Sequence, residues 1–114
     1  MTPVIWHNPR CSKSRATLAL LQAEGHEPVV RLYLQDPPSA AEIRAALLAL
    51  GQPASALVRA GEPIFRDLGL GKDMPEADLV AAMAAHPQLI ERPLVQFGSR
   101  AAIGRPPEAV LDLF

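Results

Sequence analysis

The sequence predicts an α/β fold, a four-stranded mixed sheet with helices on both faces and a helical insertion after the second strand. The first supporting observation is the order of patterns along the chain: strand, helix, strand, a block of helices, two strands and a last helix. A β-α-β start implies a parallel strand pair, because a helical crossover joins the two strands. The second is the two-residue turn Gly98-Ser99 near the C-terminus, which indicates an antiparallel hairpin.

The first β-α-β unit occupies the N-terminal third. A short apolar run predicts a strand at about Thr2 to Trp6, and helical periodicity follows from Ser12 to Glu24. Gly25 suits the position after a helix, because glycine adopts the left-handed conformation needed there. The run Val29 to Leu34 is rich in β-formers and predicts the second strand.

The middle of the chain is helical. Ser39 and Glu42 have the spacing of a capping box, which predicts a helix that ends at Gly51. Two further helical segments are expected near Ile64–Leu68 and Glu76–Ala85.

The closing hairpin pairs Leu94–Phe97 with Arg100–Ile103, and a short helix, Glu108–Leu113, ends the chain. This order of elements is that of the thioredoxin-like architecture.

Length and charge limit the classes of function. The 114 residues predict one domain, 1–114, and the net charge of −1 with a pI of about 6.3 argues against binding nucleic acid or anionic membranes. No apolar run approaches the roughly 20 residues of a membrane span, and the N-terminus does not have the pattern of a signal peptide. We therefore expect a cytoplasmic protein, in which cysteines stay reduced.

The only cysteine, Cys11, lies at the corner between the first strand and the first helix. Helix N-termini favour anions, and the neighbouring Arg10, Lys13 and Arg15 add positive charge, so the pattern predicts a thiol pKa below that of free cysteine. The alternative, a buried structural cysteine, is disfavoured by these cations. Because Ser14 replaces the second cysteine of a dithiol motif, any redox cycle must borrow a thiol from another molecule. One cysteine and three scattered histidines predict no metal site.

Arginine is the second chemical clue. Arg59, Arg92 and Arg105 each lie at or beside a predicted loop, and two of them precede proline. The planar guanidinium donates paired hydrogen bonds that match tetrahedral oxyanions. Charge counting alone does not distinguish these three from the other arginines.

From end to end, the chain resembles the glutaredoxin-dependent arsenate reductase family. The matching segments are His7-Asn8-Pro9-Arg10-Cys11 with Ser14-Arg15, Tyr33-Leu34 before Pro37-Pro38, Leu57-Val58-Arg59, His86-Pro87, Glu91-Arg92-Pro93-Leu94-Val95, and Gly104-Arg105-Pro106-Pro107-Glu108 with Val110-Leu111. The form Arg10-Cys11-Ser12-Lys13-Ser14-Arg15 is similar to a chromosomal subgroup of that family.

The resemblance implies a thioredoxin-like fold and the reduction of arsenate to arsenite, an arsenic-detoxifying activity. Cys11 would attack arsenate, and Arg59, Arg92 and Arg105 would hold the oxyanion. His7 would help to lower the thiol pKa.

Further implications concern binding and partners. Ser14 and Arg15 would contribute to the substrate site, and Pro93 would be the cis-proline of the fold. Glutathione would act as co-substrate with no tightly bound cofactor, glutaredoxin would be the protein partner, and a monomer is expected.

Two other functions stay open. A glutathione-linked thiol oxidoreductase would act on another oxyanion or on protein mixed disulfides. A non-enzymatic transcription regulator of the same fold would not need the three arginines.

Overall fold

The computed structural model describes residues 1–114, which form two compact units. The sheet unit comprises Met1–Asp36 and Arg92–Phe114, and the helical unit comprises Pro37–Glu91. The helical unit therefore enters the chain between the second and third strands, as the sequence predicted, and the expectation of one domain stays a prediction. No helix has both the length and the apolar character needed to cross a membrane.

The sheet unit contains a mixed four-stranded sheet in the order β2-β1-β3-β4. Strand β1 (Val4–Trp6) pairs in parallel with β2 (Val29–Arg31) and antiparallel with β3 (Leu94–Phe97), and β3 forms the predicted hairpin with β4 (Arg100–Ile103). Ile5 in the central strand faces Val30 on one side and Val95 on the other. The predicted sheet is confirmed.

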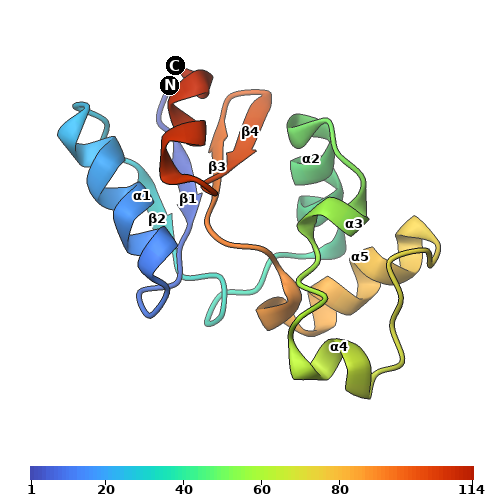
Figure 1. The fold of residues 1–114 in the computed structure, drawn as a ribbon. Coiled ribbons are helices and arrows are strands. Elements are labelled where there is room, and N and C mark those ends of the chain that lie inside the picture. Colours follow the sequence, from blue (N-terminus) through green and yellow to red (C-terminus); the bar gives the residue numbers. More distant parts are fainter. The chain divides into compact units, whose positions relative to one another are not determined.

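The core of this unit joins the sheet to α1 (Ser12–Ala23) and to the C-terminal 3₁₀ helix η2 (Pro107–Leu113), and Figure 1 shows α1 beside β1. The shared buried cluster is Ile5, Leu21, Val95, Val110 and Leu113. Burial of such side chains is worth about 1.5–3 kcal/mol each, which holds α1 and η2 against the sheet.

Several boundaries in the sheet unit differ from the sequence prediction. Strand β1 begins at Val4 rather than Thr2, and α1 ends at Ala23 rather than Glu24. Strand β2 ends at Arg31 rather than Leu34, because the backbone N–H groups of Gln35 and Asp36 both donate to the carbonyl of Leu32, each at 2.9 Å, and turn the chain. The predicted last helix is present as the 3₁₀ helix η2, which begins at Pro107 rather than Glu108.

The helical unit contains α2 (Ala40–Leu50), α3 (Ala54–Leu57), α4 (Pro63–Asp67), α5 (Glu76–Ala85) and the 3₁₀ helix η1 (Pro87–Leu89). The capping box that begins α2 is present: Ser39 Oγ accepts from the backbone N–H of Glu42 at 3.1 Å, and the Glu42 carboxylate accepts from the backbone of Ser39 at 3.0 Å. Helix α5 packs against α2 and α3 (Figure 1).

Candidate active site

The loop between β1 and α1 holds Cys11 through local hydrogen bonds. The backbone N–H of Cys11 donates to the carbonyl of Asn8, and the N–H of Arg10 donates to Asn8 Oδ1, both at 3.0 Å. Cys11 is the N-cap of α1 with φ −94° and ψ 123°, and no side chain caps the helix. The N–H groups of the first turn are therefore left to interact with an anion, and the thiolate is the nearest one.

The pKa of Cys11 lies below its ordinary value. Burial of the thiol raises the pKa, but hydrogen bonding from the backbone N–H of Ser14, the Arg92 side chain and the backbone N–H of Lys13, together with the positive charge of Arg92, outweighs that effect. The predicted direction of the shift is confirmed. A lowered pKa increases the thiolate fraction, which is the nucleophilic form of cysteine.

Arg92 and Arg105 both lie beside this thiol. Arg105 Nη2 is 3.7 Å from Cys11 Sγ, and Arg105 Nε donates to the backbone carbonyl of Arg92 at 2.9 Å. The Arg92-Pro93 peptide bond is cis, as predicted, and so is Arg105-Pro106, which the sequence analysis did not predict. Two of the three arginines predicted to hold an oxyanion therefore lie beside the Cys11 sulfur. Both belong to the sheet unit, as Cys11 does.

Gly104 is a positioning residue that the sequence analysis missed. Its backbone N–H donates to the carbonyl of Pro93 at 2.9 Å, which joins the end of β4 to the cis-proline. A Cβ at Gly104 would lie 2.5 Å from Thr17 Oγ1 and 2.8 Å from Pro93 Cγ, so only glycine fits without displacing them. Glycine at the end of a strand marks a close backbone approach, and that signal was available in the sequence.

His7 and Ser14 are buried beneath the loop. The Nδ1 of His7 shares a 2.6 Å hydrogen bond with Ser14 Oγ, and the same oxygen accepts from the backbone N–H of Asn8 at 3.0 Å. Burial, together with the positive charge of Arg15, lowers the pKa of His7 below 6.5, so the ring is neutral at pH 7. His7 makes no hydrogen bond to Cys11, and the action on the thiol that the resemblance implies stays a prediction.

Arg15 supports the loop that carries the thiol. Its Nη1 donates to the backbone carbonyl of Pro9 at 2.9 Å. This contact leaves the predicted substrate-binding role of Arg15 untested.

Arg59 belongs to the helical unit, where acidic side chains hold its guanidinium. Arg59 Nη1 donates to Glu91 Oε1 at 2.6 Å, and Nε donates to Glu62 Oε1 at 3.2 Å. The predicted role of Arg59, to hold the oxyanion together with Arg92 and Arg105, stays a prediction.

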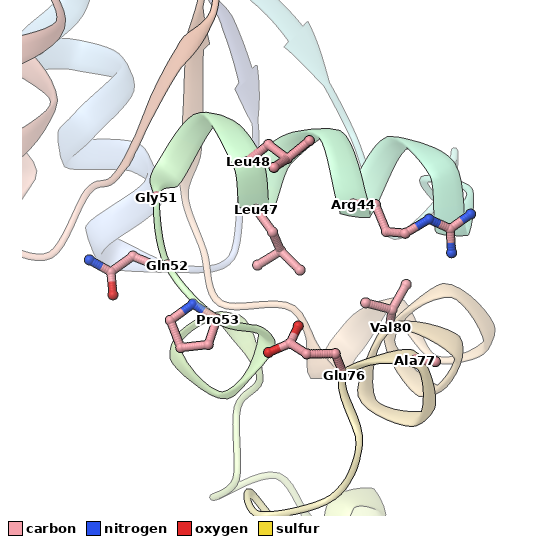
Figure 2. A pocket seen from close by; sticks show the side chains of 9 residues that line it. All are labelled: Arg44, Leu47, Leu48, Gly51, Gln52, Pro53, Glu76, Ala77 and Val80. Carbon is pink, nitrogen blue, oxygen red and sulfur yellow. The ribbon is translucent and has the colours of Figure 1, made fainter.

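A groove of about 680 Å³ in the helical unit does not contain the chemistry of a thiol site. It is lined by Arg44, Leu47, Leu48, Gly51, Gln52, Pro53, Glu76, Ala77 and Val80 (Figure 2). The Glu76 carboxylate accepts from the backbone N–H of Ala54 at 2.9 and 3.1 Å, so it fixes the start of α3.

The sheet order, the cis-proline before β3 and the lone acidified thiol at the start of α1 define a single-cysteine protein of the thioredoxin-like class. The chain belongs to the ArsC family, whose model matches residues 6–113. The resemblance seen in the motifs is therefore confirmed at the level of family and fold.

Relatives and solved structures match nearly the whole chain. It is 43% identical to an arsenate reductase of Haemophilus influenzae over 99% of each chain. It is 48% identical to the uncharacterized protein YfgD of Escherichia coli, over 96% of this chain and 93% of the relative. The structure of an arsenate reductase from Vibrio cholerae superimposes with a TM-score of 0.96 at 45% identity, covering 100% of this chain and 98% of that one.

Proposed function

We propose that this protein reduces arsenate to arsenite, with Cys11 as the nucleophile. The observation that carries the proposal is the Cys11 sulfur, which has a lowered pKa and lies 3.7 Å from Arg105 Nη2 at the start of α1. Relatives named arsenate reductase at 43% identity support the choice of arsenate among oxyanions.

In the first step, the Cys11 thiolate attacks arsenic and a sulfur–arsenic bond forms. One arsenate oxygen leaves as water after it takes up protons. Arg92 and Arg105 offset the negative charge of the oxyanion, and such preorganised donors are worth more in a transition state than in water. Arsenic stays in the +5 state in this step, so no electrons are transferred.

In the second step, the thiolate of glutathione attacks the adduct. A disulfide forms between the glutathione and Cys11 sulfurs, the sulfur–arsenic bond breaks, and its electron pair stays on arsenic. Arsenic thereby falls from +5 to +3 and leaves as arsenite. Because the chain has one cysteine, glutaredoxin then reduces the mixed disulfide by thiol exchange.

The test is steady-state arsenate reduction with and without glutathione and glutaredoxin. We expect full turnover only with both, and no activity in Cys11→Ser. Arg92→Ala should lose about 10²–10³ in rate, the usual effect of removing one oxyanion donor. Arg44→Ala, which removes an exposed charge from α2, should retain activity.

Mass spectrometry after treatment with arsenate and glutathione should find one glutathione on Cys11. Arsenate reduction that survives Cys11→Ser would disprove the mechanism. Uptake of glutathione without arsenate reduction would favour a thiol oxidoreductase with another substrate.

A further inference from the structure

A second cavity, which belongs to the sheet unit, lies beside the loop that carries Cys11. It measures about 220 Å³ and lies between the loop after β1 and the turn after β2. Its lining residues are His7, Asn8, Pro9, Arg10, Leu32, Leu34 and Gln35. No step of the proposed arsenate chemistry uses this cavity.

Both walls of the cavity are held in place. On one side, the Asn8 carbonyl and side chain accept backbone N–H groups of the cysteine loop. On the other, the Leu32 carbonyl accepts two N–H groups, and Arg31 Nε donates to the carbonyl of Asp36 at 3.1 Å. The cavity is therefore formed before a ligand arrives, which reduces the entropy cost of binding.

Three polar groups at the cavity make no polar contact within the chain. The guanidinium of Arg10, the amide nitrogen of Asn8 and the side-chain amide of Gln35 make no hydrogen bond or ion pair. Leu34 is 43% exposed beside them and supplies an apolar surface. One cation, two amides and an apolar surface match a short acidic peptide, with its carboxylate on Arg10 and its peptide bonds near the amides.

We propose that this cavity binds the peptide part of the thiol co-substrate, glutathione or a similar acidic thiol peptide. The inference rests on the proposed function, which requires such a thiol to reach the Cys11 adduct. The cavity is lined by His7–Arg10, the loop directly before Cys11, so a peptide held there lies against the loop that carries the adduct. Arg10 thus selects the co-substrate, while Arg92 and Arg105 lie against the sulfur.

The test is a titration of the reduced, full-length protein with S-methylglutathione, followed by amide NMR shifts. This analogue binds without reacting and needs no arsenate. We expect saturable shifts at Leu32, Leu34 and Gln35. Arg10→Ala should weaken binding about tenfold, the effect of one charge-assisted hydrogen bond. Leu34→Asp should also weaken it, because it places a negative charge at the cavity.

Lys13→Ala is the matched control, since Lys13 is an exposed cation on the other side of Cys11 in sequence. Equal weakening by Arg10→Ala and Lys13→Ala would mean general electrostatic attraction and would overturn the site. Absent shifts with intact glutathione-dependent arsenate reduction would also overturn it, and leave the proposed function standing. If the NMR shifts appear as expected but the protein does not reduce arsenate, the glutathione site stands and the proposed arsenate reduction is rejected. In turnover, Arg10→Ala should raise the KM for glutathione and leave the KM for arsenate unchanged.

Discussion

Replacing Ser14 by alanine tests how the thiol loop is held. Ser14 is fully buried, and its hydroxyl bonds both to His7 Nδ1 at 2.6 Å and to the backbone N–H of Asn8 at 3.0 Å. His7 and Asn8 are themselves buried, so neither finds bulk water as a replacement partner. Ser14→Ala thus leaves two buried polar groups without their hydrogen bonds.

Each buried polar group that loses its partner costs about 1–3 kcal/mol. Alanine favours the helix by about 0.5 kcal/mol relative to serine, which offsets part of the loss. We expect Ser14→Ala to lower the free energy of unfolding by about 1.5–5.5 kcal/mol. For a domain of this size that is a fall in Tm of roughly 6–22 °C.

Urea and thermal unfolding measure this effect, and Ser12→Ala is the matched control. Ser12 lies in the same first turn of α1 but is exposed. A second measurement is the pH midpoint of Cys11 alkylation, which should rise in Ser14→Ala because the N–H of Ser14 no longer holds its position beside the sulfur. If Ser14→Ala and Ser12→Ala unfold alike, the hydroxyl does not anchor the loop and the reasoning is wrong.

Three further predictions concern stability. Gly104→Ala should cost about 1–3 kcal/mol through overpacking, whereas Gly61→Ala, with open space at its Cβ position, should cost far less; equal losses in urea unfolding would contradict the close approach. The pKa of His7 is lower in the folded protein than in the unfolded chain, so the unfolded chain binds the His7 proton more tightly. The stability that the neutral His7 contributes is therefore fully present above pH 6.5, and it is lost as the pH falls through the folded-state pKa. The loss between pH 7.5 and 5.5 should be smaller in His7→Gln, and an unchanged pH dependence would exclude His7 as its source. Ser39→Ala should cost about 1 kcal/mol by removing the cap of α2, as seen in the urea midpoint.

Local signals predicted most of the fold correctly. The capping box at Ser39 and Glu42, the positive φ of 66° at Gly51 and the hairpin turn at Gly98 all depend on residues close in sequence. Patterns of this kind act through the backbone of a few residues, so they can be recognised without knowledge of distant contacts.

Tertiary contacts explain what the sequence did not predict. Helix α3 has four residues, too few for a periodic pattern, and its first N–H is capped by Glu76, 22 positions away. The end of β2 was placed too late because Tyr33 and Leu34 have the composition of a strand, yet Tyr33 is fully buried in a turn. Gly104 gains its role from Thr17 and Pro93, which only the fold brings near.

The acidity of Cys11 and the hydrogen bonds of His7 suggest an indirect role for the histidine. The resemblance assigned His7 to the thiol, but a buried, neutral imidazole supplies no positive charge to an anion. What His7 does supply is a hydrogen bond to Ser14, and the backbone N–H of Ser14 is the largest of the contributions that lower the pKa of Cys11. We therefore expect His7 to influence the thiol through the position of the first turn of α1. On this account, a neutral side chain that preserves the bond to Ser14 preserves most of the thiol acidity.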